Sequence, residues 1–156
     1  MNPDLDALKD LQSQDTRISG LEAEAARLPR QIEAIQAVLA DARKAVETLK
    51  GRGETTKKDL RAKEKDLEVV AGKRSKSEAR LYEVKTNKEY SAVLVEIEEI
   101  KQEKARTEEE ILSLMELQER LGIDIRDAEA RLKTREAEAR QDEAVVREKL
   151  AGVENE

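Results

Sequence analysis

The sequence predicts an all-α fold, a long antiparallel two-helix coiled-coil hairpin whose first helix is kinked near Pro29. Charged residues make up 42% of the 156 residues and only two residues are aromatic, so a conventional globular core is excluded. The apolar residues recur at alternating steps of three and four, which is the heptad pattern of a coiled coil. A helix-capping signal near residue 86 divides this pattern into two stretches.

The first heptad stretch predicts a helix over about residues 4–84. Pro29 has no amide hydrogen, so we expect the helix to kink or restart there. A turn at Gly51 and Gly53 would instead create a three-helix bundle, and Gly72 leaves an earlier end to the helix open. The pattern is clearest where ten successive positions are apolar: Ile18, Leu21, Ala25, Leu28, Ile32, Ile35, Leu39, Ala42, Val46 and Leu49.

A turn is predicted at about residues 85–87 and a second helix at about 87–152, so that residues 1–156 form a single hairpin. Thr86 and Glu89 have the spacing of a capping box, in which the Thr hydroxyl accepts from the Glu89 amide and the Glu carboxylate accepts from the Thr86 amide. A second heptad stretch starts at Tyr90. Helices joined by a short connection are antiparallel neighbours. The alternative is one uninterrupted helix, with Thr86 and Glu89 as ordinary surface residues.

A register follows if facing residues have numbers that sum to 174, which leaves a short loop centred on Asn87. The polar pair Thr56 and Gln118 then falls together, which supports this choice. The same rule places Leu49 opposite Ile125 and Ala42 opposite Leu132.

This register leaves the start of the first helix without a partner. Leu21 would face Val153, and Ile18 would face Glu156. Leucines 5, 8 and 11 precede both, and apolar side chains grouped on one helix are unfavourable in water. We therefore expect Leu5, Leu8 and Leu11 either to mediate a homodimer or to pack on a segment outside this sequence.

Charge is distributed unevenly along the chain. Residues 50–88 hold thirteen Lys/Arg and seven Asp/Glu, whereas residues 89–156 hold eleven and twenty. A basic coiled-coil arm can bind nucleic-acid backbones, although stacking aromatics are missing. Alternatively, these cations only complement the acidic second helix. The candidate nucleic-acid-binding residues are Lys57, Lys58, Arg61, Lys65, Lys73, Arg74, Lys76 and Arg80.

The composition also excludes several kinds of chemistry. Cys and His are absent, so the chain offers no thiol nucleophile, no imidazole base and no zinc site with the usual ligands. No catalytic constellation is present, and we expect no enzyme, no metal and no cofactor bound to this chain. No apolar run approaches the roughly 20 residues of a membrane span, and the acidic start lacks the features of a signal peptide. We therefore expect a cytoplasmic protein that does not contact membranes.

Residues 81–98, LYEVKTNKEYSAVLVEIE, resemble the hairpin signature of a bacterial family. The opening Leu8-x-x-Leu11-Gln12-x-x-Asp15, which leads to Leu28-Pro29, and residues 109–116 are also similar. Members of that family join a long coiled-coil hairpin to a small C-terminal zinc ribbon with four cysteines. No cysteine follows here, so zinc is expected only where a ribbon accompanies the hairpin.

The resemblance implies an adaptor role, since some members are associated with the sigma-54 factor and flagellar gene expression. We therefore predict a non-enzymatic adaptor or scaffold that binds a regulatory protein, such as a sigma-54 type factor. The alternative is a nucleic-acid-binding arm. At the turn the backbone reverses and the aromatics Tyr82 and Tyr90 approach each other, although Tyr90 could simply close the last layer against Val84. The predicted partner-binding residues are Lys85, Thr86, Asn87, Lys88, Glu89 and Tyr90.

Overall fold

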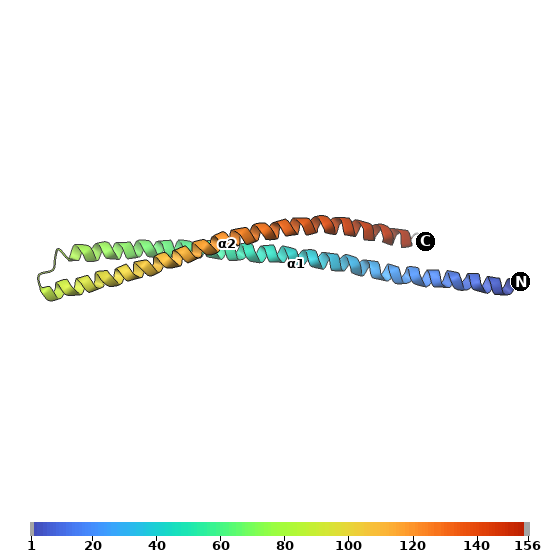
Figure 1. Cartoon of the computed structure of the whole chain (residues 1–156), viewed down its shortest axis with the longest axis horizontal. Helices are drawn as coiled ribbons and strands as arrows, with labels where there is room; N and C mark the ends of the chain where they lie inside the picture. The colour runs from blue at the N-terminus through green and yellow to red at the C-terminus, as the bar shows by residue number, and fades with distance from the viewer. Residues whose placement is uncertain (1, 155–156) are drawn as a thin grey trace. The chain divides into compact units, whose positions relative to one another are not determined.

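The computed structural model describes residues 2–154, which form two α-helices. Helix α1 (Pro3–Arg80) and helix α2 (Asn87–Glu154) are joined by residues 81–86 (Figure 1). The described residues contain no strand. The predicted helical hairpin is therefore confirmed. The single uninterrupted helix is wrong, because the chain leaves helical geometry between Arg80 and Asn87.

Helix α1 is continuous across every predicted breaker. Pro29, Gly51, Gly53 and Gly72 all lie inside it, so the three-helix bundle and a restart at Pro29 are both wrong. A helical glycine costs only about 1 kcal/mol relative to alanine, a penalty that packing against the second helix can offset. A bend of the axis at Pro29 stays a prediction. Helix α1 ends four residues earlier than predicted, and α2 runs two residues further.

The chain packs as two compact units, each built from one stretch of either helix. Unit 1 comprises Met1–Val46 and Ala128–Glu156, and unit 2 comprises Glu47–Asp127 with the turn. In unit 2 every buried residue occupies a predicted heptad position, which confirms the seam between the helices. These buried residues are Thr56, Val70, Ser77, Val93, Ile97, Ile100, Thr107 and Leu121.

Ion pairs in unit 2 agree with the predicted register near the turn. Lys73 Nζ lies 3.8 Å from Glu103 Oε1, and Arg80 Nη1 lies 3.0 Å from Glu96 Oε2. Each of these four residues directly precedes an a position of the heptad. Residues that flank an antiparallel seam in this way meet when the a and d layers pair as the 174 rule requires.

The buried polar side chains of unit 2 are all satisfied. Thr56 and Thr107 donate their hydroxyls to carbonyls one turn earlier in their own helices, at 2.8 and 2.9 Å. Ser77 instead donates across the seam to Glu96 Oε1 at 3.3 Å. Among the described residues no buried side-chain nitrogen or oxygen lacks a hydrogen-bond partner. These threonines therefore interrupt the apolar seam without leaving an unpaired polar atom inside it.

In unit 1 the seam of α2 departs from the prediction after Leu132. Arg135 and Asp142, which the heptad count places in the seam, are exposed, whereas Glu136 and Glu143 are half-buried. A straight helix drifts by about 20° per heptad against a 3.5-residue repeat, and two successive steps of four correct this drift. The observed seam therefore runs through Ala128, Leu132, Glu136, Ala139, Glu143, Val146, Leu150 and Val153.

The register of unit 1 nevertheless follows the 174 rule. One groove of this unit is lined by Ile35 with Ala139 and by Leu39 with Arg135, and each pair sums to 174. Leu28 and Val146, which the rule also places opposite each other, are both buried. The change from Arg135 to Glu136 in the seam therefore alters which side chains of α2 face α1, but not which layers pair.

Cysteine cross-linking tests this register in unit 1, since the chain has no native cysteine. We expect Ala42→Cys with Leu132→Cys to react faster with a short bifunctional thiol reagent than Ala42→Cys with Glu136→Cys. The reason is that four helical residues move the second position by about 6 Å along α2. Equal rates, or faster reaction of the 42/136 pair, would contradict the register.

Candidate functional site

The end of α1 is held by backbone hydrogen bonds of the tight 3₁₀ type. The amides of Leu81, Tyr82 and Glu83 donate to carbonyls three residues earlier, at 3.2, 3.2 and 3.0 Å. The amide of Val84 donates to Arg80 O at 3.2 Å. These bonds satisfy the carbonyls that a helix end leaves open. They also explain why the regular α-helix ends at Arg80, since the next three residues form i→i−3 bonds in place of the α-helical i→i−4 bonds.

Thr86 caps the start of α2. Its Oγ1 accepts from the amide of Glu89 at 3.1 Å, and its carbonyl accepts from the amide of Tyr90 at 3.0 Å. The Glu89 carboxylate accepts from the amide of Lys85 at 3.1 Å. The predicted capping box is thus confirmed with one correction, because the carboxylate receives the amide of residue 85 and not that of Thr86. Both sides of the turn are therefore tied down.

The hairpin tip, residues 81–90, exposes side chains on this fixed backbone. The Tyr82 side chain is 92% exposed and that of Tyr90 is 47% exposed. Lys85 and Lys88 are exposed and form no ion pair with any described residue. Thr86 and Glu89 serve the cap, so four of the six predicted site residues have side chains available to a partner: Lys85, Asn87, Lys88 and Tyr90.

The sequence analysis did not include Tyr82 among the site residues, although it is the more exposed of the two aromatic side chains at the tip. Its position one residue after the seam residue Leu81 is the signal that could have identified it. Tyr90 does not close the seam fully against Val84, since it keeps nearly half of its surface exposed. Leu94, one helical turn after Tyr90, is also exposed and extends the apolar edge of the tip.

A shallow groove of about 290 Å³ lies beside the seam next to the tip. Arg80, Glu83, Glu89 and Glu96 line it above a floor that includes Val93. Arg80 Nη1 donates to both carboxylate oxygens of Glu96, at 3.0 and 3.3 Å. Arg80 therefore joins the two helices and is not a free cation for a phosphate.

The predicted basic residues fall into two groups. Four of them pair with a glutamate. Lys73 and Arg80 pair with glutamates of α2, as the prediction that the cations complement the acidic second helix requires. Lys57 and Arg74 pair instead with glutamates of α1 itself. The other half are exposed and form no ion pair with any residue in 2–154. Their spacing of three, four and eleven residues places them on one outward face of α1, opposite the seam. We call them the basic stripe: Lys58, Arg61, Lys65 and Lys76.

Lys63 occupies a seam position, but its ammonium group lies at the edge of the seam, where it pairs with the Glu110 carboxylate. The two side chains lie 2.5 Å apart. The hydrogen bond to Glu110, together with its negative charge, raises the pKa of Lys63 above its ordinary value of 10.5. Lys63 thus stays protonated at neutral pH and cannot act as a general base.

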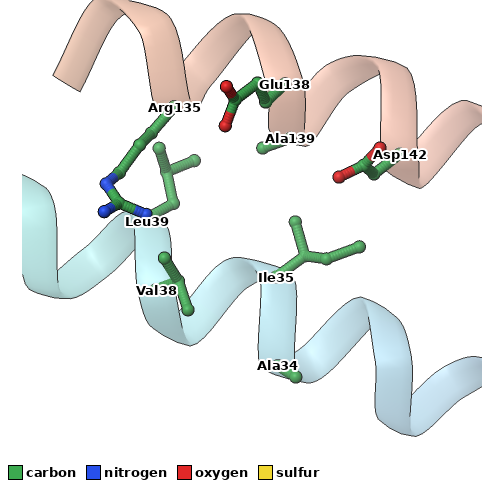
Figure 2. A pocket seen from close by; sticks show the side chains of 8 residues that line it. All are labelled: Ala34, Ile35, Val38, Leu39, Arg135, Glu138, Ala139 and Asp142. Atoms are coloured by element: carbon green, nitrogen blue, oxygen red, sulfur yellow. The ribbon is translucent and has the colours of Figure 1, made fainter. Parts of the chain in front are cut away.

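A second groove, of about 280 Å³, lies in unit 1 where α2 leaves the heptad count (Figure 2). Its apolar wall is formed by Ile35, Val38 and Leu39 of α1. Figure 2 shows Arg135 reaching from α2 toward α1, while Glu138 and Asp142 form the rest of a polar rim. The groove is open to solvent and holds no nucleophile beside a base, so it has no arrangement for catalysis.

Within residues 2–154 no three metal-ligating side chains converge on a common point. The same range contains no helix that is long and apolar enough to cross a bilayer.

Replacing Thr86 by alanine tests whether the cap holds the tip. Loss of an N-cap hydroxyl costs about 1 kcal/mol, so we expect the free energy of unfolding to fall by about that amount in a denaturant titration. Thr55→Ala is the matched control, because the Thr55 hydroxyl only donates to Gly51 O within α1. A loss no larger for Thr86→Ala than for Thr55→Ala would show that the cap does not contribute to stability.

A family model described as the CT398-like coiled coil hairpin domain matches residues 11–156. Among solved structures, CT398 from Chlamydia trachomatis is similar, with a TM-score of 0.85 and 21% identity over 97% of this chain. This chain covers 64% of the CT398 chain, and a likeness at this identity shows the fold alone. No protein with a curated description matches. Because the family model spans nearly all of the sequence, the protein belongs to the CT398-like coiled coil hairpin family.

Proposed function

We propose that the protein is a non-enzymatic cytoplasmic adaptor that binds a regulatory protein through the hairpin tip. The observation that carries this proposal is the Tyr82 side chain, 92% exposed on a backbone that hydrogen bonds fix on both sides. The flanks of the hairpin repeat similar charged side chains and so discriminate poorly between partners. The tip combines aromatic and basic side chains found together nowhere else among the described residues.

The fixed backbone favours binding for an energetic reason. A partner that docks on an ordered turn does not have to order it, so more of the contact energy appears as affinity. Tyrosine is a frequent anchor of interfaces because its ring buries a large area with few rotatable bonds. Lys85 and Lys88, which have no ion-pair partner among residues 2–154, add attraction to carboxylates. The expected docking site on the partner is therefore a pocket for an aromatic ring with acidic residues at its edge.

The resemblance in residues 81–98 makes a sigma-54 type factor the first partner to test. It also suggests that hairpins of this kind act beside a four-cysteine zinc ribbon. This chain has no cysteine or histidine to hold that zinc, so the proposal for the tip rests on the hairpin residues alone.

The basic stripe supports a second candidate function, binding of a nucleic-acid backbone. Its four cations lie on one face of α1 and have no ion-pair partner among residues 2–154. Phosphates could replace the water around these side chains without breaking an existing ion pair. The four paired basic residues lack this property, since a phosphate would have to compete with their glutamates.

Binding of a purified sigma-54 factor tests the tip. We expect Tyr82→Ala, and separately Lys85→Glu with Lys88→Glu, to weaken binding at least tenfold, which corresponds to about 1.4 kcal/mol. These side chains lie outside the seam, so thermal unfolding should barely change. Biolayer interferometry with the immobilised hairpin measures the affinity.

Lys58→Glu with Lys65→Glu is the matched control, because it reverses two exposed cations of the stripe. It should leave the affinity within about twofold, allowing for long-range attraction. No binding by the unmodified chain would reject this partner. Equal weakening by both double variants would reject the tip as the principal site.

Salt dependence tests the second candidate. If all four stripe residues contact phosphates of duplex DNA, the logarithm of the binding constant should fall with the logarithm of salt concentration with a slope of roughly −3.6. Lys58→Glu with Lys65→Glu should flatten this slope, whereas Lys85→Glu with Lys88→Glu should not. Fluorescence anisotropy with a labelled random-sequence duplex gives both values. A slope near zero, or one unaffected by the stripe variant, would contradict nucleic-acid binding by the stripe.

A further inference from the structure

The first turns of α1 present an apolar face that the hairpin does not cover. Leu5, Leu8, Leu11 and Ile18, which we call the leucine face, are between 50% and 62% exposed. Isolated exposed leucines are common, but four large aliphatic side chains on one side of one helix are typical of an interaction surface. The prediction that Leu5, Leu8 and Leu11 lack a partner within the chain is thus confirmed for the described residues.

The leucine face continues the seam of unit 1. Within that unit, Leu21 and Val153 are both half-buried, and α1 extends past the described end of α2 (Figure 1). Leu11 and Ile18 lie at intervals of seven residues from the seam residue Ala25. A partner helix that packs along the same line on α1 would therefore cover them. The predicted contact between Ile18 and Glu156 lies outside the described residues.

We propose that a second copy of this chain covers the leucine face, by antiparallel pairing of residues 3–20 from both copies. The two-fold axis lies near Leu11 and Gln12. Each copy then supplies a helix that covers the leucine face of the other, in the position where α2 would continue. Leu5 of one copy lies near Ile18 of the other, and the two Leu11 side chains meet at the axis.

Charge favours this orientation over a parallel pair. A parallel pair would place Asp4, Asp6, Asp10 and Asp15 of one copy beside the same residues of the other. The antiparallel pair moves the Asp4 and Asp6 groups to opposite ends and brings Lys9 near Asp15 of the other copy. Antiparallel helix dipoles also attract, whereas parallel ones repel.

The symmetry of the pairing limits the assembly to a dimer. The same surface of both copies is used, so the contact closes on itself and leaves no leucine face for a third copy. The hairpin tips take no part in the contact and stay available to other partners.

Sedimentation equilibrium of the whole chain tests the proposal. We expect a concentration-dependent equilibrium between monomer and dimer for the unmodified protein. The variant Leu5→Gln, Leu8→Gln, Leu11→Gln should dissociate at least tenfold more readily with nearly unchanged helicity. The control Val69→Gln, Leu112→Gln, Met115→Gln replaces three side chains with similar exposure in unit 2 and should dimerise like the unmodified protein.

Cross-linking tests the relative orientation of the two copies. With a short thiol reagent, a mixture of Asp6→Cys and Arg17→Cys proteins should form mixed dimers in preference to like pairs. In the antiparallel pair, position 6 of one copy lies beside position 17 of the other, while the two positions 6 are roughly 16 Å apart along the helix. Preferred like pairs would overturn the antiparallel arrangement.

Two other results would overturn the proposal as a whole. The first is a monomer at all concentrations, which would show that a second copy does not cover the leucine face. The second is loss of the dimer in the control variant to the same extent as in the leucine variant, which would place the contact elsewhere.

Discussion

The narrow apolar seam between α1 and α2 is the constraint on which the rest of the structure depends. Within the hairpin the seam is where the two helices bury their aliphatic side chains, because their other faces are mostly charged. The ion pairs across the seam are largely exposed, and such pairs contribute only about 0–1 kcal/mol each. Burial in the seam must therefore supply most of the free energy of folding. Residues outside the seam contribute little to that stability, so they can serve in binding.

The turn gives the hairpin an ordered end that exposes side chains to a partner. The 3₁₀ bonds after Arg80 and the Thr86–Glu89 cap fix both ends of the connection, so the helices can meet in register near the tip. The same bonds satisfy backbone groups that would otherwise require water or a partner. Apart from Thr86 and Glu89, which form the cap, the exposed side chains of the tip are not needed to hold the turn, and Tyr82, Lys85 and Lys88 are exposed to solvent on an ordered backbone. Order of the backbone and exposure of the side chains together make the tip suitable for recognition.

Periodicity predicted the seam of unit 2 because burial there follows the heptad count without interruption. It failed at Arg135 and Asp142, since a small drift per heptad accumulates along a straight helix and the sequence does not show where the drift is corrected. The predicted end of α1 was wrong because Leu81 and Val84 continue the heptad pattern, whereas the backbone there already forms 3₁₀-type hydrogen bonds. The division of the basic residues into paired and unpaired sets depended on which glutamates lie within reach, and the sequence alone could not rank Lys73 above Lys76. Tyr82 was not predicted as a site residue because its solvent exposure distinguishes it, and the heptad pattern does not show exposure at the turn.

The central claim is that the tip is an ordered platform, and backbone ¹⁵N relaxation of the isolated chain measures this most directly. The account predicts order parameters for residues 81–90 close to those of the helices, about 0.85, with Lys85 and Glu89 among the most restricted because their amides donate to the cap. Values below about 0.6 across residues 84–88 would mean that the turn is flexible on the picosecond-to-nanosecond timescale, and would contradict the account.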